Sequence, residues 1–535
     1  MPPHSFGWDR CGVKSETTEC GGGAVARARS QVPEGTRIRR MPIELFNTLG
    51  SRVEPLTASR DNTLRMYCCG PTVYDYGHIG NFRTFLHVDV LRRTARLNGF
   101  VLKHVMNITD VDDKIIRNAG AAGVSIADYT AKYEKAFFDD MDALGVERPE
   151  IVAHATESIP EMVALVKQLA SEDIAYKTED GSWYFRIAKF PDYGKLSGKD
   201  LEGIEDGARV DVDEYEKDAA RDFALWKATK PGEASWKTEI GEGRPGWHIE
   251  CSAMALKHLG PNFDVHAGGE DLTFPHHENE IAQSECATHQ PFARHWFHVR
   301  FLLVEGKKMS KSEGNFYTLR DLLLKGYRAS AIRFLLISVP YRNQMNFTFE
   351  GLTESANAIE RLRTFVRRLD AAVKNPALPE AANEELLALT VAKRDAFHAA
   401  LQNDLNTAEA RAAVFDMVRA ANITLDNGTF GCGNVDAVQK LLSDFDAVFD
   451  VLTDRDAAIS KAAVEWAKAE GRTDIAAELL QAQSITEEEI EALIAERTDA
   501  RKKRNFARGD AIRNELLEKG IVIEDGKEGV TWKRK

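Results

Sequence analysis

The pattern of apolar and polar positions between residues 62 and 106 predicts a strand, a helix and a second strand. Residues 62–69 have strand character, which Gly70-Pro71 ends because proline cannot continue a hydrogen-bonded ladder. A helix is expected after Gly77, where apolar residues recur at helical spacing: Phe82, Phe85, Leu86, Val90 and Leu91. Residues 100–106 form the second strand. Two strands joined through a helix predict a parallel α/β sheet.

The pattern changes three times further along the chain. Residues from about 155 to 245 read as short hairpins and loops, which predicts an insertion between two halves of the sheet. Residues 297–304 return to strand character, and residues from about 350 to 450 are almost wholly helical in pattern. We therefore expect a Rossmann-like α/β domain at 41–349 that contains the insertion, a helical domain at 350–455 and a small module at 485–535.

Composition places the chain among ordinary globular proteins. It has 535 residues, of which 43% are hydrophobic and 29% charged, and it contains no apolar run of the roughly 18–20 residues that a membrane span needs. Seven scattered cysteines, an odd number, are not typical of a disulfide framework and favour a reducing, cytoplasmic location. We expect residues 1–40 to be a disordered extension, because they show no apolar periodicity. A transit peptide is the alternative, which four acidic residues disfavour.

The net charge of -13 argues weakly against a nucleic-acid partner, but charge is unevenly distributed. Residues 496–535 carry 12 Lys and Arg against 8 Asp and Glu, a net charge of +4. This segment contains the basic run Arg501, Lys502, Lys503 and Arg504 on a predicted helix, with Phe506 and Trp532 nearby in sequence. Basic side chains neutralise phosphates and aromatic rings stack on unpaired bases, so the segment is a candidate RNA-binding surface. A solvated basic helix face is the alternative.

The string His78-Ile79-Gly80-Asn81 stands at the start of the first predicted helix. Unpaired N–H groups at a helix N-terminus attract anions, and Gly77 and Gly80 allow a nucleotide to approach the backbone closely. His78 could donate to phosphate oxygens that gain charge during a reaction. An ordinary helix N-terminus with an exposed histidine is the alternative.

A second phosphate-handling string, KMSKS, occupies residues 308–312, and Lys307 precedes it. Gly306 and Gly314 flank it, and Lys308 and Lys311 are compact charges suited to the β- and γ-phosphates of ATP. A mobile loop of this kind could stabilise a transition state more than the ground state. The alternative is a solvated Lys/Ser loop.

Metal-capable side chains gather at residues 246–252 and 274–280. Pro275 favours a helix start, which would put His276 and Glu280 one above the other on one face while His277 points about 100° away. Alone, this pair could be an ordinary helix-surface interaction, and Cys251 could be a buried core residue.

Four strings together resemble cysteinyl-tRNA synthetase, a class I aminoacyl-tRNA synthetase: CGPTVYDYGHIGNFRTF, GWHIECSAM, FPHHENEIAQS and KKMSKSEGN. The resemblance covers nearly everything from Met41 onward. Three features depart from the family pattern: Asn81 replaces a histidine, residues before Met41 are additional, and Cys68 precedes Cys69. Neighbours in a strand face opposite sides, and the place of Cys69 immediately before Gly70 favours it as the ligand.

The resemblance implies an activity and the residues for it. Cysteine would be activated with ATP, with Mg²⁺, and transferred to the 3′ end of tRNA(Cys); no membrane or protein partner is implied. The implied catalytic residues are His78, Lys308 and Lys311. The implied binding residues are Gly77, His78, Gly80, Asn81 and Lys311 for ATP, Thr72 and Trp247 for cysteine, and Arg501, Lys502, Lys503, Arg504 and Trp532 for the anticodon end of tRNA.

The resemblance also implies one zinc ion per chain, held by Cys69, Cys251, His276 and Glu280. Two thiolates, an imidazole and a carboxylate suit Zn²⁺, and a site at the carboxyl end of a parallel strand would lie beside the nucleotide crevice. Four protein ligands fill a tetrahedral site. When cysteine arrives, either the coordination number expands to five or one ligand loosens, and Glu280 is the first candidate for that ligand.

Two other functions remain open on the sequence. Ligases that join cysteine to an amino-sugar share the catalytic core but lack the C-terminal module, so residues 496–535 argue against them. A non-catalytic tRNA- or zinc-binding relative is the other alternative, and the presence of His78, Lys308, Lys311 and all four ligand candidates argues against it.

Overall fold

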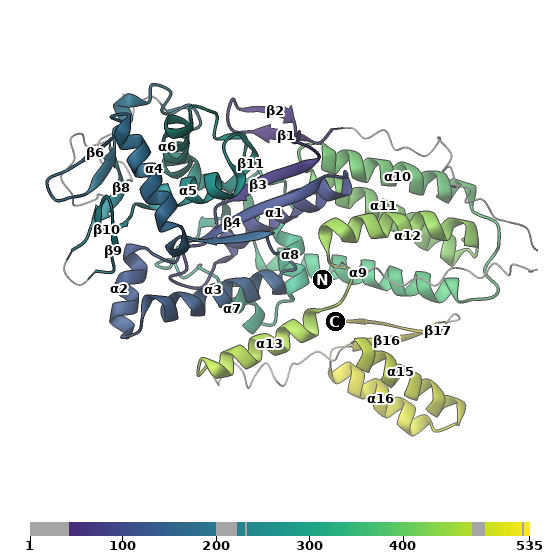
Figure 1. Cartoon of the computed structure of the whole chain (residues 1–535). Helices are drawn as coiled ribbons and strands as arrows, with labels where there is room; N and C mark the ends of the chain where they lie inside the picture. Colours follow the sequence, from purple (N-terminus) through teal and green to yellow (C-terminus); the bar gives the residue numbers. More distant parts are fainter. Residues whose placement is uncertain are drawn as a thin grey trace, which may run out of the picture.

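A computed structural model describes residues 42–199, 222–230, 233–472, 487–519, 521–526 and 529–534. The extension expected at residues 1–40 lies outside the described residues, as does part of the insertion. In the part that is described, an α/β domain, a group of long helices and a small C-terminal module follow one another along the chain (Figure 1). No helix among the described residues is long and apolar enough to cross a membrane.

The α/β domain is built on a five-stranded sheet in the order β12-β11-β3-β4-β5, in which all neighbouring strands are parallel. The strands are β3 (Thr63–Cys68), β4 (Val101–Ile108), β5 (Ile151–His154), β11 (Phe263–Gly269) and β12 (Ala293–Val299). The strand order reverses at β3, which pairs with β4 on one side and with β11 on the other. Ligands bind at such a reversal in open α/β sheets, outside the carboxyl ends of the strands.

Helices connect the strands of this sheet, as the apolar periodicity predicts. They are α1 (Ile79–Leu97), α2 (Asp113–Ala122), α3 (Ile126–Ala143), α4 (Ile159–Ser171), α5 (Trp247–Leu259) and α6 (Glu278–Thr288). A short hairpin of β1 (Glu44–Asn47) and β2 (Arg52–Pro55) precedes the sheet. The expected Rossmann-like class is confirmed, because a parallel sheet with connecting helices forms from the predicted strand, helix and strand.

Between α4 and α5 the described residues form a second sheet, antiparallel and in the order β6-β7-β8-β10-β9. Its strands are β6 (Ala175–Lys177), β7 (Trp183–Phe185), β8 (Phe223–Ala228), β9 (Trp236–Thr238) and β10 (Gly241–Pro245). This sheet lies within the region that interrupts the α/β pattern, and it leads directly into α5, which carries Cys251.

One predicted strand is wrong in its extent. Residues 297–304 are two strands in different sheets: β12 ends at Val299, and β13 (Leu302–Val304) pairs with β14 (Lys307–Lys308) and with β15 (Met345–Phe347). The break occurs because Arg300 donates its N–H to the carbonyl of Tyr341, 2.9 Å away, outside the main sheet. An apolar run alone does not reveal where a chain changes partners.

Helices follow this small sheet. They are α7 (Leu319–Leu324), α8 (Ala329–Leu336), α9 (Phe349–Val373), α10 (Glu384–Gln402), α11 (Thr407–Asp426), α12 (Cys432–Phe449) and α13 (Asp456–Ala469). The long helix α9 follows β15 directly and lies next to the C-terminal module (Figure 1). There the Arg367 guanidinium lies 3.9 Å from the centre of the Trp532 ring.

The C-terminal module is two helices packed on a two-stranded antiparallel sheet. Its elements are α15 (Glu487–Lys502), α16 (Phe506–Glu518), β16 (Ile521–Gly526) and β17 (Gly529–Arg534). The predicted helix through the basic run is wrong in one respect: α15 ends at Lys502, and Lys503 and Arg504 form the turn to α16. The reason is local, since Arg504 has a positive φ of 58° and the Asn505 side chain caps the next helix by accepting the N–H of Arg508.

Candidate functional site

Cys69 lies at the point where the order of the parallel sheet reverses. It follows β3 directly and donates its N–H to the carbonyl of Ala267 in the neighbouring β11. Its neighbour Cys68 is fully buried in the apolar core, and burial raises the pKa of that thiol to about 12. Strand alternation therefore separates the two cysteines: Cys69 faces other polar groups and Cys68 does not.

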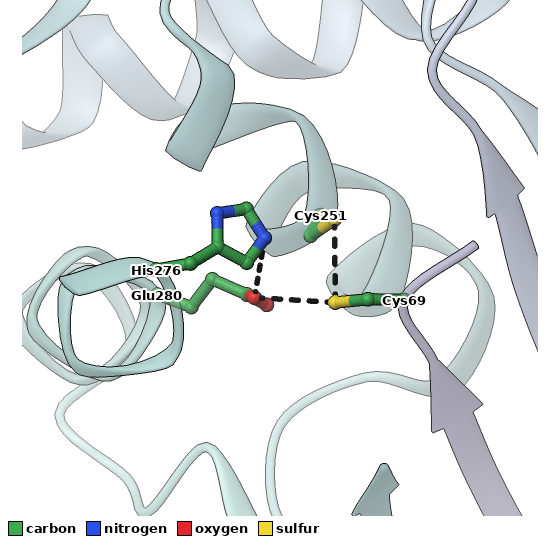
Figure 2. A group of neighbouring side chains, drawn as sticks. All are labelled: Cys69, Cys251, His276 and Glu280. Atoms are coloured by element: carbon green, nitrogen blue, oxygen red, sulfur yellow. Dashed lines mark hydrogen bonds and ion pairs between the residues drawn. The ribbon is translucent and has the colours of Figure 1, made fainter. Parts of the chain in front are cut away.

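Cys69, Cys251, His276 and Glu280 come together from three separate parts of the chain (Figure 2). One side-chain atom from each lies within 4.8 Å of the others, and all four residues are buried. The two sulfurs are 3.8 Å apart, and Nε2 of His276 is 3.1 Å from Oε1 of Glu280. Two sulfurs, one ring nitrogen and one carboxylate oxygen at such distances could close around a single metal ion.

The charges in this cluster support each other. Burial would disfavour the ionised form of Glu280, but the imidazoles of His266 and His276 outweigh it and lower the pKa of Glu280 to about 2. Burial likewise opposes protonation of His276, and the Glu280 carboxylate outweighs it, so the pKa of His276 rises to about 10. Burial also works against ionisation of Cys251; hydrogen bonds with Cys69 and His276 prevail and bring its pKa to about 6. The pKa of Cys69 is raised by its burial and by its partner thiol.

His277 faces this cluster, contrary to the prediction that it points away. Its Nε2 lies 3.3 Å from Sγ of Cys69, and its Nδ1 lies 2.8 Å from Nε2 of His298. The expected separation of about 100° assumes one regular helix from Pro275, whereas the backbone is kinked at Phe274 (φ -142°, ψ 132°) and α6 begins only at Glu278. A different backbone turn places two consecutive histidines around one site.

A second group of four overlaps the first and contains Cys69, His266, His277 and Glu280, whose ligand atoms also lie within 4.8 Å of one another. His266 comes from the middle of β11, and its Nε2 is 2.9 Å from Oε2 of Glu280. Sequence reasoning missed His266 and His298. The signal that could have found them is a histidine among apolar residues in a predicted strand, since a buried imidazole needs a partner.

Trp247 and Thr72, the candidate cysteine-binding residues, occupy different surroundings. Trp247 is 43% exposed, and its ring stacks on the His276 ring with 4.3 Å between their centres, so it stands beside the cluster at its solvent side. Thr72 forms a short parallel bridge with Thr109 just beyond the carboxyl end of β3. The Thr109 hydroxyl in turn donates to the buried carboxyl of Glu250, 3.0 Å away.

His78 caps helix α1, and this contact fixes the state of its ring. Its Nδ1 accepts the N–H groups of Gly80 and Asn81 at 3.1 and 3.3 Å, so the proton of the neutral ring is on Nε2. Burial and the nearby Lys311 lower the pKa of His78 to about 4, which keeps the ring neutral at pH 7. Oδ1 of Asn81 accepts the N–H of His78 and completes the cap. Asn81 thus has a structural contact that the sequence does not reveal.

The KMSKS loop lies against this helix start. The N–H of Ile79 donates to the carbonyl of Tyr317, and the ring of Phe316 packs edge-on against His78 with 5.1 Å between centres. The loop leaves β14 after Lys308 and is exposed. Nζ of Lys311 is 2.8 Å from Oδ2 of Asp75, which raises the pKa of Lys311. Asp75 is a further residue that the sequence analysis did not single out.

The candidate RNA-binding residues divide into an exposed set and a buried one. Arg501, Lys502, Lys503 and Arg504 are exposed at the turn between α15 and α16, next to the exposed ring of Phe506. Trp532 is only 3% exposed, and its Nε1 donates to Glu491 at 2.7 Å. The structure therefore places Trp532 in the core of the module and not on its surface.

Protein-family models match three parts of the chain. The catalytic domain of class I (C) tRNA synthetases matches residues 55–357, a DALR domain matches residues 396–453, and the anticodon-binding domain of cysteinyl-tRNA ligase matches residues 486–532. The last match covers the module that amino-sugar ligases would lack.

Similar proteins and structures agree with these matches. A protein named cysteine–tRNA ligase from Koribacter versatilis is 57% identical to this chain, and one from Solibacter usitatus is 53% identical. Each alignment covers 92% of this chain and 100% of the relative. Among solved structures, Mycobacterium tuberculosis methionyl-tRNA synthetase in complex with methionyl-adenylate matches this chain with a TM-score of 0.53. The match covers 80% of this chain and 94% of that chain at 15% identity, which shows a likeness of fold alone. With a catalytic-domain model that spans more than half of the chain and relatives that match it nearly from end to end, the chain belongs to the cysteinyl-tRNA synthetase family of class I.

Proposed function

We propose that this chain is a cysteine–tRNA ligase that activates L-cysteine with ATP and transfers it to the 3′ end of tRNA(Cys). The observation that carries the proposal is the buried cluster of two thiols, an imidazole and a carboxylate at the carboxyl end of β3. The same strand end leads through Thr72 and Asp75 to the His78 cap and its phosphate loop. A thiol-selecting group and a nucleotide-handling group are therefore adjacent in the chain and share one edge of the sheet.

We propose Zn²⁺ as the metal, held by Cys69, Cys251, His276 and Glu280. The donor set fits, because paired thiolates with imidazole and carboxylate are typical of zinc. When bound there, zinc would favour the ionised thiol of cysteine over the hydroxyl of serine, which is a harder and poorer ligand.

A second arrangement of ligands has its own observation, the group that contains His266 and His277. We favour the first group because it includes both thiols, and because each of the two extra histidines contacts a ligand of that group. His266 contacts Glu280 and His277 contacts Cys69, the positions of residues that orient ligands from outside. If the favoured assignment is right, replacing Cys251 removes the metal, while His266→Gln weakens its binding without abolishing it.

In cysteine activation, the substrate carboxylate attacks the α-phosphorus of ATP, and pyrophosphate leaves. Nε2 of His78 carries the proton of a neutral ring and can donate to the oxygens that gain charge at that phosphorus. Lys308 and Lys311 are exposed on the loop and can follow the departing phosphates. We assign Gly77 and Gly80 to ATP binding as well; they keep the start of α1 free of side chains, since a Cβ there would press on the rings of Phe82 and His78, and Asn81 holds the cap. Mg²⁺ would accompany ATP.

In the second step the terminal ribose hydroxyl of tRNA attacks the acyl carbonyl and releases AMP. We assign tRNA contacts to Arg501, Lys502, Lys503 and Arg504, which are exposed together at one turn. Trp532 is left out because its ring is buried against Arg367 and Glu491.

Trp247 is our candidate for closing the cysteine pocket, since it stacks on His276 and remains partly exposed. We expect the enzyme to act in the cytoplasm.

The direct test has two stages. Purified protein should catalyse cysteine-dependent exchange between ATP and pyrophosphate, with serine and alanine far less effective, and should then charge tRNA(Cys). Exchange without charging would favour another acceptor such as an amino-sugar. Absence of exchange under any metal supplement would overturn the proposal.

A further inference from the structure

A hollow with a volume of about 620 Å³ lies among α8, α9 and α11, away from the cluster and the phosphate loop. Two arginines line it, Arg361 from α9 and Arg411 from α11. Ser338, Ser355 and Asn357 add polar side chains, and the exposed Glu354 is the carboxylate in the lining. A concave surface of this size with convergent polar groups is typical of a ligand site.

Arg411 differs from the other inward-facing arginines in having neither an ion pair nor a hydrogen bond among the described residues. Among these residues Arg83 also lacks a carboxylate partner, but its guanidinium donates to four backbone carbonyls. Arg333 is paired with Asp89 at 2.7 Å, Arg363 with Asp456 at 3.0 Å and Arg320 with Asp140 at 2.9 Å. Within the described parts of the chain, by contrast, no carboxylate lies within ion-pair distance of Arg411 or Arg361. A half-buried cation without a counter-charge is costly, and burial lowers the pKa of Arg411 to about 10.

The Arg411 guanidinium is held in place. It lies 3.9 Å from the centre of the Phe334 ring, which is fully buried in α8. Stacking on an aromatic face fixes the plane of the guanidinium and leaves its N–H groups free at the edge. The Arg361 guanidinium lies 5.6 Å from the centre of the Phe415 ring on α11. Two guanidinium groups that line one hollow together with hydroxyl and amide groups are donors of the kind that bind a phosphate.

We propose that the hollow lined by Arg361 and Arg411 binds a phosphate of the tRNA backbone. The placement of α9 favours tRNA as the source. Its first residue donates its N–H to Glu305, at the turn that leads into the KMSKS strand, and Arg367 further along contacts the C-terminal module. Its 25 residues span about 37 Å, which is the distance that a tRNA in contact with both the KMSKS hairpin and the C-terminal module would bridge. The inference rests on the proposed tRNA ligase function.

The test compares Arg411→Met and Arg361→Gln with Arg419→Gln. Arg419 lies two turns further along α11, is exposed and has a local partner in Asp416 at 3.7 Å. Each of the first two variants should weaken tRNA binding about three- to tenfold, whereas Arg419→Gln should not. The slope of log binding constant against log salt concentration (the salt slope) should also become about 1 less steep in these two variants. Cysteine-dependent pyrophosphate exchange, which needs no tRNA, should continue in all three.

Stability separates a binding role from a structural one. If Arg411 awaits an anion, Arg411→Met keeps or raises the melting temperature of the free protein, because it removes an uncompensated charge. If Arg411 is structural, the melting temperature falls together with exchange activity, and the proposal is overturned.

Inorganic phosphate distinguishes the sources of the anion. Suppose that phosphate stabilises the wild type but not Arg411→Met at matched ionic strength, and that Arg411→Met binds tRNA as tightly as the wild type. This result would overturn tRNA as the occupant and leave a site for free phosphate. Unchanged tRNA binding without phosphate stabilisation would overturn the site itself. A wild-type enzyme that activates cysteine but never charges tRNA would instead contradict the proposed function.

Discussion

The buried cluster and the phosphate loop stand at the same edge of the sheet but are built in opposite ways. Each residue of the cluster is at most 6% exposed, and its members come from β3, α5 and the segment around α6. The loop lysines come from one short segment, and the Lys311 side chain is 66% exposed. Fixed, desolvated donors suit the selection of a small substrate, whereas exposed charges on a short loop suit a group that must move when a product leaves.

The largest effect should come from breaking the cluster. Cys251→Ala removes the thiol whose ionisation Cys69 and His276 favour, so we expect most of the zinc to be lost and cysteine-dependent exchange to fall by at least about 100-fold. Metal analysis of the purified variant measures the first effect. Cys68→Ala is the matched control, because Cys68 is equally buried but faces the core. Full zinc content in Cys251→Ala would show that the ligand assignment is wrong.

The loop should fail differently. Lys311→Ala should slow adenylate formation by about 100-fold while cysteine binding and zinc content stay unchanged, because the role we propose for its charge is to stabilise the departing pyrophosphate. Single-turnover activation kinetics measure this. Lys307→Ala removes an exposed lysine from the same hairpin and should have little effect. A loss of cysteine affinity with a normal activation rate would contradict the assigned role.

The basic turn of the C-terminal module should affect only the tRNA step. A chain ending near residue 485 should keep cysteine activation, since the cluster and both phosphate strings precede that point, but should charge tRNA at least about tenfold less efficiently. Neutralising Arg501, Lys502, Lys503 and Arg504 together should lower the salt slope of tRNA binding by about 1 for each tRNA phosphate that these side chains neutralise. A truncated chain that charges tRNA normally would remove these residues from the function.

The smallest effect concerns the ion pair between Asp75 and Lys311. In the role we propose for Lys311, ATP displaces Asp75 before a phosphate can reach the lysine. Asp75→Asn should therefore lower the KM for ATP, by at most about fivefold because exposed ion pairs are weak. Initial rates of exchange at varied ATP concentration measure it. A higher KM would mean that Asp75 helps to bind the nucleotide, and the loop would then be more fixed than we infer.

Local features were predictable from the sequence because they depend on residues that are neighbours in the chain. Apolar periodicity predicted the first strand and helix, and the spacing of His276 and Glu280 predicted a pair that does meet, 3.1 Å apart. Strand alternation distinguished Cys69 from Cys68. The end of the strand after Val299, however, depends on a hydrogen bond from Arg300 to Tyr341, 41 residues away, and no local pattern contains it.

The sequence by itself determined the class of fold, the helix start at His78, the exposed lysine loop and the residue types of the cluster. Only the tertiary structure decided that His266, His277 and His298 surround the cluster, that Asp75 holds Lys311, that Trp532 is interior and that Arg411 has no carboxylate partner among the described residues. The physical reason is that periodicity and capping are set within a few residues, while burial and pairing depend on which distant segments the parallel sheet brings together.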